Sequence, residues 1–493
     1  MPKVFIFGID GGSLDLINLW GNNLPNFSKL IRNGTSGYLH TIIPMLTPPG
    51  WTSFATGKNP AKHNIFDFFK IKNYNKELIN SYDRKTEALW DVLSRNNKKS
   101  IILNLPATYP PQPLNGIMIC GAETPSIKTD FTYPRDYKEK IFKLNPDYKT
   151  GIDPKNLEYK NYEALLEDLY KVTNYYKNLI LHIIENEEWD LFIAVFEDVD
   201  RLQHYLWKYM DSKHPAYVKG NKFENAIHDY YKKLDNILGE ILLKLPKDVN
   251  LFVISDHGFG PIYKQIFINN FLLEKGYLKL KSNIKENKIN VKDFLIKIAY
   301  KLKIKHLIFR LPEKMRNKMK NLIPSQDLTN VDWNGTKAYF NSYSGQYILI
   351  NLKGRDPNGI IEENEYNEIL KNLKNDLFNL EDNGKKIIKN VYSASEIYNG
   401  ENLKNAPDLF VITEDGYILQ EGFNSKLIDL FNEDKVYRSA DHRDNGILII
   451  YGENVKQNYK LEANILDIFP TILKIFNIQI SEDVDGKIIS CFN

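Results

Sequence analysis

The feature that most constrains the fold is a series of short apolar runs, each followed by a small or acidic residue. These runs cover residues 4–9, 100–103, 191–196 and 251–254. Stretches with the apolar spacing of amphipathic helices lie between them, for example at 162–184 and 223–245. Continuous apolar strands that alternate with helices are typical of a parallel sheet covered on both faces. We therefore predict an α/β fold built on a mostly parallel sheet.

Acidic residues stand directly after three of these expected strands. Asp10 ends the first run, Glu197 to Asp200 follow the third, and Asp256 comes shortly after the fourth. In open α/β sheets, ligands bind beyond the carboxyl ends of the strands. These acidic residues are therefore expected to lie where a ligand would bind.

Side chains suited to metal ligation occur in four clusters near expected strand ends. An Asp–xxx–His pair alone is more often an ordinary helix-surface contact, so the four clusters together carry the interpretation. Three aspartates and three histidines suit zinc, manganese or iron, and imidazole ligands favour zinc. The candidate ligands are Asp10, Asp200, His204, Asp256, His257 and His442.

A hydroxyl group completes the set. In TPPGWTSFATG, Thr47 precedes Pro48, and proline is favoured at the first helical position, so we expect Thr47 to be the N-cap of a helix. A helix amino terminus also favours a bound phosphate. A metal ion that contacts this oxygen would lower its pKa and make it a nucleophile.

Overall composition excludes several classes of protein. The 493 residues include 65 Lys and Arg and 62 Asp and Glu, for a net charge of +3, which argues against a general nucleic-acid-binding surface. Two cysteines, Cys120 and Cys491, are too few for a disulfide framework or a cysteine-rich metal cage. The apolar run at 4–9 soon meets Asp10, and no run approaches the ~20 apolar residues of a membrane span. We expect a soluble cytoplasmic protein.

One segment departs strongly from this balance. Residues 275–320 contain 15 Lys or Arg and three acidic residues, and they show helical apolar spacing. Three interpretations stay open: a solvated face of a lysine-rich chain, an element that steers an anionic substrate, or a contact with a membrane surface or a lipid-linked substrate. Specific nucleic-acid binding ranks last, because the segment mostly lacks interleaved aromatic residues.

The order of these motifs resembles the alkaline phosphatase superfamily. The series is Asp10, TPPGWTSFATGKNPAKHNIFDF, Asp200–xxx–His204, SDHG and a late DHR, followed by ILDIFPTILKIFNIQISEDVDGK. Within the superfamily it is most similar to the type I phosphodiesterase/nucleotide pyrophosphatase family, in an uncharacterised branch of predicted phosphohydrolases or phosphomutases. The resemblance runs from residue 3 to about residue 488 and covers the basic segment least. It implies an alkaline-phosphatase-like three-layer αβα core at 1–270 and 336–493, with a basic helical insert at 271–335.

The resemblance also implies a reaction. Two divalent metal ions would lie about 4 Å apart, as in two-metal sites generally. It implies that Thr47 attacks a small anionic phosphoester, forming a phosphothreonine that water then hydrolyses. The implied ligands are Asp10, Asp256, His257 and Thr47 for one ion, and Asp200, His204 and His442 for the other.

The chain departs from the family at the substrate clamp. Nucleotide pyrophosphatases usually carry an asparagine 21 positions after the nucleophile, where this chain has Phe68. Pro48 also lacks the N–H that could donate to a phosphoryl oxygen. Arg443 and Arg201 are candidate replacements, although a structural ion pair is the commoner role for each. His63 matches a family position, and we interpret it as structural.

These departures leave several functions open. A phosphodiesterase ranks first, and a phosphomonoesterase or phosphomutase of the same superfamily is the alternative. A metal-holding binding protein without turnover is the third hypothesis. A sulfatase is excluded, because Thr47-Pro-Pro-Gly-Trp lacks both the cysteine or serine and the arginine of the sulfatase nucleophile motif.

Overall fold

The first apolar run forms a central strand of a ten-stranded sheet. In the computed structural model, β1 (Lys3–Ile9) pairs in parallel with β8 (Leu191–Phe196) on one side and with β9 (Val249–Ile254) on the other. Beyond β8, the parallel pairing continues through β5 (Ser100–Leu103) to β6 (Gly116–Ile119). The predicted α/β fold with a mostly parallel central sheet is confirmed. The structure describes residues 2–121, 123–152, 156–157, 160–281, 328–342, 345–432 and 438–492.

Antiparallel strands extend this sheet on both sides. β20 (Asn445–Tyr451) pairs with β9, and β2 (Thr35–His40) pairs with β20. At the opposite edge, β7 (Thr132–Tyr133) pairs with β6. The short strands β21 (Tyr459–Lys460) and β22 (Ala463–Asn464) add to β2 in parallel.

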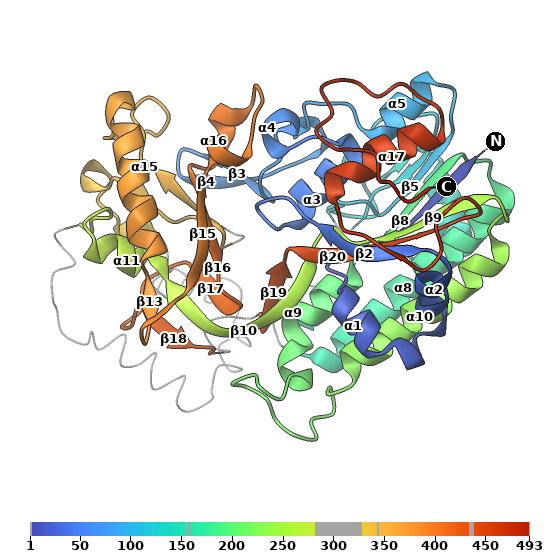
Figure 1. The fold of residues 1–493 in the computed structure, drawn as a ribbon, viewed down its shortest axis with the longest axis horizontal. Helices are drawn as coiled ribbons and strands as arrows, with labels where there is room; N and C mark the ends of the chain where they lie inside the picture. The colour runs from blue at the N-terminus through green and yellow to red at the C-terminus, as the bar shows by residue number, and fades with distance from the viewer. Residues whose placement is uncertain are drawn as a thin grey trace.

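Helices cover both faces of the sheet, as the three-layer αβα expectation required (Figure 1). In α8 (Tyr162–Asn186), buried positions such as Leu165, Leu169 and Val172 recur every three or four residues. One layer contains α3 (Thr47–Thr56), α5 (Leu89–Arg95) and α17 (Ile468–Ile475), and the other contains α2 (Pro25–Asn33), α8 and α10 (Ala226–Lys244).

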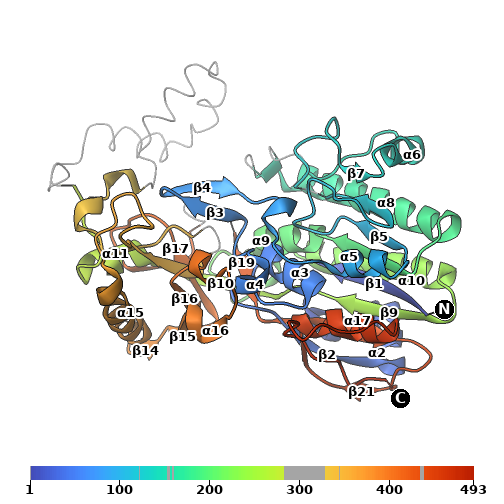
Figure 2. The same cartoon turned by 90° about the horizontal axis from the view of Figure 1, so that it is seen from above.

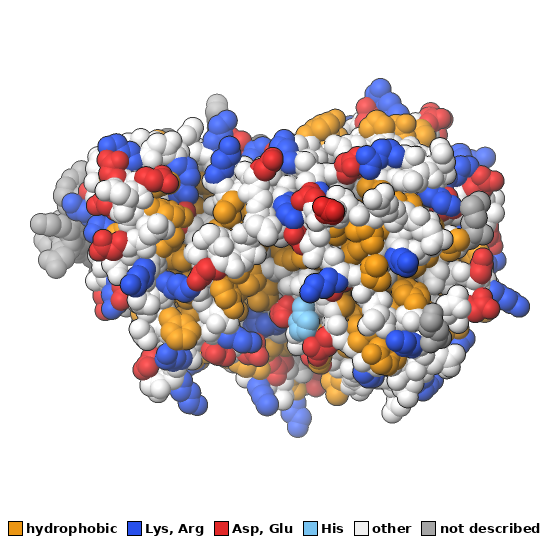
Figure 3. Space-filling model, turned by 45° about the horizontal axis from the view of Figure 1, so that its top comes forward, with side chains coloured by type: hydrophobic (Ala, Val, Ile, Leu, Met, Phe, Trp, Pro, Cys, Tyr) orange, Lys and Arg blue, Asp and Glu red, His pale blue; other side chains and the backbone are white. Residues whose placement is uncertain are grey.

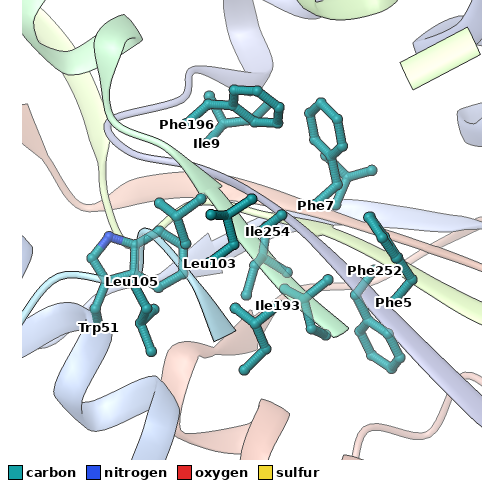
Figure 4. Packing of buried hydrophobic residues seen from close by; sticks show 14 of the residues in the cluster. Phe5, Phe7, Ile9, Trp51, Leu103, Leu105, Ile193, Phe196, Phe252 and Ile254 are labelled. Carbon is teal, nitrogen blue, oxygen red and sulfur yellow. The ribbon is translucent and has the colours of Figure 1, made fainter. Parts of the chain in front are cut away.

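The central strands carry the main hydrophobic core. Phe5, Phe7 and Ile9 from β1 are fully buried and pack with apolar side chains of β8, β9 and β5 (Figure 4). The rings of Phe7 and Phe196 lie 4.9 Å apart, and those of Phe5 and Phe192 lie 5.0 Å apart. This packing fixes the strand ends that bear the candidate metal ligands.

A second, smaller lobe lies beside the first (Figures 1 and 2), and it contains its own hydrophobic cluster. β10 (Gly258–Phe267) joins the two lobes: its first residues pair with β19 (Ala440–Arg443) and its last with β17 (Gly416–Gln420) and β18 (Ile428–Leu430). The smaller lobe also contains β11 (Ala338–Tyr339), β12 (Tyr347–Ile350), β15 (Ile388–Ser393), β16 (Leu409–Thr413), α11 (Ile268–Glu274), α15 (Glu363–Phe378) and α16 (Ala394–Ile397).

The remaining helices and strands are short, apart from α9, which carries candidate ligands. They are α1 (Leu14–Leu19), α4 (Pro60–His63), α6 (Tyr137–Leu144), α9 (Asp198–Met210), β3 (Phe69–Lys72), β4 (Asn75–Leu78), β13 (Glu381–Asp382) and β14 (Lys385–Lys386).

The expected basic insert at 271–335 falls largely outside the described residues, because 282–327 are not described. Its described margins contribute to the second hydrophobic cluster: Phe271, Tyr277 and Val331 are buried there. Over the face shown in Figure 3, Lys and Arg are interspersed with Asp and Glu. Among the described helices, none is both long enough and apolar enough to cross a bilayer.

Candidate metal centre and its pocket

The candidate ligands come from separate segments that meet at one edge of the central sheet. Asp10 immediately follows β1, while Asp256 and His257 lie between β9 and β10. Both strands are parallel neighbours, so their carboxyl ends lie side by side. All three residues are at most 1% exposed. Burial in the sheet edge therefore holds these donors together.

The β10–β19 ladder brings the last histidine to this edge. Phe259 pairs with His442 in the antiparallel register, which places His442 beside His257. The two imidazole rings stack with their centroids 3.7 Å apart. The short β10–β19 ladder thus brings together two histidines that lie 185 residues apart in the sequence.

The helix α9 supplies the remaining pair. Asp200 lies in its first turn and His204 one turn later, so both side chains face the same way. Asp200 Oδ1 lies 3.4 Å from His204 Nε2 and 3.0 Å from His442 Nε2. The i, i+4 spacing that marked this pair in the sequence is therefore used to form one cluster with His442.

Thr47 is the first residue of α3, but it is not the N-cap. Leu46 occupies the N-cap position with extended backbone angles, and no side chain caps the helix there. The expectation of a capping threonine was wrong because Pro48 occupies the second helical position rather than the first. The Thr47 hydroxyl is consequently directed to the ligand cluster: its Oγ1 lies 3.3 Å from Asp10 Oδ1 and 3.4 Å from His257 Nε2.

Two further residues of α3 fit this helix against the ligands. Trp51 donates from its indole Nε1 to Asp10 Oδ2 at 3.0 Å, which fixes the carboxylate. Gly50 permits the close approach, because a Cβ there would lie only 3.2 Å from the Cβ of Asp256. All ten residues of α3 are buried, so the helix is held rigidly.

Each histidine presents the same ring nitrogen to the cluster. His204 Nδ1 lies 2.8 Å from the carbonyl of Ala440, and His442 Nδ1 lies 2.8 Å from that of Met45. His257 Nδ1 lies 3.1 Å from the carbonyl of Gly258. Because a carbonyl only accepts, each Nδ1 carries the proton and each Nε2 is free to act as a ligand.

This arrangement fits a bound cation. The Nε2 atoms of His204 and His442 lie 3.0 Å apart, which sets two lone pairs against each other when both rings are neutral. Asp256 Oδ2 is buried, has no hydrogen-bond partner among the described residues, and lies 3.2 Å from His257 Nε2. A divalent cation among these atoms would relieve both conflicts.

The carboxylates show the same crowding of negative charge. Burial raises the pKa of Asp10 well above its usual range, and the charges of Asp256 and Asp200 add to this effect. Burial likewise raises the pKa of Asp256. For Asp200, burial opposes ionisation, but the neighbouring His204 and His442 outweigh it and hold the pKa well below its usual range.

Three groups of side chains place one donor atom each within 4.8 Å of one another. One of them matches an expected ligand set, and the other two share His442. Asp441 is a donor that the sequence interpretation missed, although it directly precedes His442. The groups are Asp10, Asp256 and His257; Asp200, His257 and His442; and His204, Asp441 and His442.

A pocket of about 330 Å³ opens onto this cluster. Phe68 and Arg201 line it together with Thr47, so both of these predicted substrate-side residues lie beside the predicted nucleophile. Arg443 lies elsewhere: it lines a different cavity, and its guanidinium donates to the carbonyls of His442 and Pro261 at 2.8 and 2.9 Å. Glu197, which the sequence placed after a strand at the ligand-binding edge, also lines the pocket, and so do Glu123 and Arg438, which the sequence interpretation did not single out.

His63 stabilises α3 through a contact with Ser53. Its Nδ1 accepts from the N–H of Ile65 at 3.1 Å, so its Nε2 donates to Ser53 Oγ at 2.9 Å. Both side chains are fully buried. Burial lowers the pKa of His63 to about 3, so the ring is neutral. These contacts are those of a structural histidine.

Comparison with known proteins matches residues 4–443 to the family model described as type I phosphodiesterase / nucleotide pyrophosphatase. Ectonucleotide pyrophosphatase/phosphodiesterase family member 1 of Rattus norvegicus is 25% identical over 287 residues, which cover 57% of this chain and 26% of that protein. Family member 3 of Bos taurus is 32% identical over 93 residues, covering 18% and 10%. The chain thus spans about a quarter or less of the curated relatives it matches.

Solved structures share the fold over nearly the full length. Human ectonucleotide pyrophosphatase/phosphodiesterase 5 aligns with a TM-score of 0.52 at 13% identity, covering 98% of this chain and 97% of that chain. An inactive threonine-to-alanine variant of the murine protein, in complex with AMP, aligns with a TM-score of 0.52 at 12% identity, covering 97% and 96%. The match over residues 4–443 decides the assignment: the chain belongs to the type I phosphodiesterase/nucleotide pyrophosphatase family.

Proposed function

We propose that this protein is a two-metal phosphohydrolase that cleaves phosphodiester or pyrophosphate bonds through a phosphothreonine on Thr47. The observation that carries the proposal is the position of the Thr47 hydroxyl, 3.3 Å from Asp10 and 3.4 Å from His257, at the wall of an open pocket. A buried threonine that makes no helix cap, and instead faces a cluster of metal-ligand side chains, is suited to nucleophilic attack.

The proposed ligand sets follow the geometry of the donors. Asp10, Asp256 and His257, with Thr47, would hold one divalent cation, and Asp200, His204 and His442 the other, with Asp441 beside them. We propose zinc, because three imidazoles contribute, with manganese or iron as alternatives. When bound, such ions would lower the pKa of the Thr47 hydroxyl and offset the charge of the phosphoryl group.

The chain's own residues account for the rest of the reaction. Thr47 Oγ1 forms a bond to phosphorus as the bond to the opposite alcohol oxygen breaks, and the departing alcohol takes up a proton. Water then attacks the phosphothreonine from the side that the alcohol left, which releases the phosphomonoester of the remaining alcohol and restores the Thr47 hydroxyl. Two in-line displacements give net retention at phosphorus. Arg201 is the proposed donor to a non-bridging oxygen.

One of the compared structures supports the role of a threonine. The murine neighbour binds AMP in a variant that is called inactive after one threonine was replaced by alanine. That result agrees with a reaction that depends on a threonine. All proposed ligands lie within 1–270 and 336–493, which we propose as the catalytic core, with 271–335 as a substrate-side element.

The test compares an aryl diester with an aryl monoester. Purified protein with zinc is assayed on bis(4-nitrophenyl) phosphate and 4-nitrophenyl phosphate, and we expect kcat/KM to favour the diester by about tenfold or more. A preference for the monoester would favour the alternative, a phosphomonoesterase or phosphomutase. Absence of turnover on either, with metal bound, would favour a binding protein.

Phe68→Asn tests the missing phosphate clamp. Phe68 lines the pocket beside Thr47, where a side-chain amide could donate to a phosphoryl oxygen. A hydrogen bond to a charged group contributes about 1.5–3 kcal/mol, so we expect kcat/KM for bis(4-nitrophenyl) phosphate to rise about tenfold. Phe68→Leu is the matched control, because it removes the ring without adding a donor. Equal rates in the two variants would contradict the idea.

A further inference from the structure

The pocket beside Thr47 carries a balanced set of charges. Apart from the proposed metal ligands, two acidic and two basic residues are among the described residues that line it. Arg201 donates to Glu197 Oε2 at 2.9 Å, and Arg438 lies 3.6 Å from Asp441. An additional charge on the substrate, whether positive or negative, would therefore be repelled by a residue of like charge at this wall. A neutral polar group fits these electrostatics best.

Glu123 is held in a fixed orientation at this wall. Both of its carboxyl oxygens accept from the backbone N–H of Ala107, at 2.8 and 2.7 Å. Burial, reinforced by the charge of Glu197, raises the pKa of Glu123 to about 8. A carboxyl group that retains its proton at neutral pH can donate one hydrogen bond and accept others. This combination matches an alcohol hydroxyl, which also donates and accepts.

The guanidinium of Arg201 is also held in a fixed orientation. Besides Glu197, its guanidinium lies 3.7 Å from Asp198 Oδ1. Asp198 is itself held by the hydroxyl groups of Thr173 and Tyr230, which donate to its Oδ2 at 2.8 and 2.9 Å. A guanidinium anchored through buried carboxylates loses little entropy when it binds a substrate oxygen. The pocket is therefore preorganised for hydrogen bonding.

The size and walls of the pocket agree with a compact polar group. Its volume is about 330 Å³, and Phe68, Pro106 and Tyr205 add apolar surface to the charged residues. Carbon-bound hydrogens of a sugar or polyol could pack on such surfaces while the hydroxyl groups bond to the charged side chains.

We propose that Glu123 recognises a hydroxyl group of the substrate, and that this pocket selects phosphodiesters of polyhydroxyl alcohols such as glycerol or a sugar. The proposal rests on the proposed phosphodiesterase activity and names its substrate class. A site built to hydrogen-bond a hydroxyl group discriminates strongly against an analogue that lacks it, because its buried polar groups are then left unpaired.

Symmetrical diesters test this directly, because the same alcohol occupies the pocket whichever arm departs. Hydrolysis of bis(glyceryl) phosphate and dipropyl phosphate is followed by phosphorus NMR. We expect kcat/KM of the wild-type protein to favour the glyceryl ester by about 100-fold. In Glu123→Leu this ratio should fall below about fivefold, whereas Glu123→Gln, which keeps a donor and an acceptor, should retain most of it. Glu188→Leu, on the exposed surface, is the control and should keep the wild-type ratio.

A second measurement needs no variant. Glycerol 1-phosphate should inhibit the wild-type protein about tenfold more strongly than propyl phosphate does. A wild-type ratio near one, equal inhibition, or an unchanged ratio in Glu123→Leu would each overturn the proposal. Bis(4-nitrophenyl) phosphate separates the two levels of failure. If it is hydrolysed in a Thr47-dependent way while the glyceryl preference is absent, only the substrate class is wrong. If no diester is hydrolysed, the proposed function fails as well.

Discussion

Thr47→Ala is expected to lower kcat for a phosphodiester by about 10³-fold or more, because removal of a covalent nucleophile generally has effects of this size or larger. Two other hydroxyl groups of α3 are engaged elsewhere and are not placed to take over. Ser53 Oγ is bonded to His63 Nε2, and Thr56 Oγ1 donates to the carbonyl of Thr52. Steady-state rates on bis(4-nitrophenyl) phosphate, with metal content measured in each preparation, check this result.

Two controls distinguish loss of the nucleophile from damage to the helix. Thr47→Ser keeps a hydroxyl group and should retain activity within about tenfold of wild type, because only a methyl group is lost. Thr52→Ala alters a buried threonine of the same helix and should change kcat by only a few-fold. An acid quench of turnover with labelled substrate should trap the labelled phosphoryl group on residue 47 in the wild type, in Thr47→Ser and in Thr52→Ala, and should trap none in Thr47→Ala. Retention of more than a tenth of the wild-type kcat in Thr47→Ala would exclude the nucleophile assignment.

The central sheet could be predicted from the sequence because its strands are short, continuous and apolar. The runs at 100–103 and 191–196 coincide with β5 and β8, and the run at 4–9 with all but the first residue of β1. Strands buried on both faces leave this pattern in the sequence whatever their neighbours are. Their order in the sheet leaves no such trace, because it depends on pairing between distant segments.

The smaller lobe was not predicted, for a physical reason. Its strands β12, β15 and β16 pair antiparallel, and β15 buries only Ile388 and Val391 of its six residues instead of forming one apolar run. The sequence of β15 therefore shows neither a continuous apolar run nor a regular alternation that would mark it as a strand. The lobe is held together by a second hydrophobic cluster that joins 266–278 to 331–419.

Some residues of the candidate site could be predicted from the sequence, and others could not. His204 could be chosen because its spacing from Asp200 lies within one helix turn, and His442 because it stands just before a strand. Asp441, Glu123 and Arg438 lie at the site through the β10–β19 ladder and the loops around the pocket, which no local pattern records. Arg443 shows the converse, since strand alternation turns it away from its neighbour His442.

Removal of divalent metal is expected to lower both activity and melting temperature. The donors come from the residue after β1, from α9, from β19 and from the β9–β10 connection, so a cation that binds them joins distant parts of the fold. A cation present at 1,000 times its Kd stabilises a native protein by about 4 kcal/mol. With an unfolding entropy near 2.1 cal/mol/K per residue, this corresponds to a fall of about 4 °C for each cation removed. Calorimetry after dialysis against a chelator, and again after addition of zinc, checks this result.

Asp256→Asn is the informative control. Metal removal is expected to destabilise the wild-type protein, whereas this substitution is expected to stabilise the metal-free protein. Asp256 Oδ2 is a buried carboxylate oxygen that lacks a hydrogen-bond partner among the described residues, and burial raises the pKa of this group. Replacing it with a neutral amide should raise the melting temperature of the metal-free protein while weakening metal binding and abolishing the response to the chelator. If metal-free wild type and metal-free Asp256→Asn melt at the same temperature, and if the chelator leaves the wild type unchanged, these carboxylates do not form a metal centre. If metal-free Asp256→Asn melts at a higher temperature than metal-free wild type, and if the chelator lowers the melting temperature of the wild type, the cluster of negative charge destabilises the metal-free chain and binds a cation.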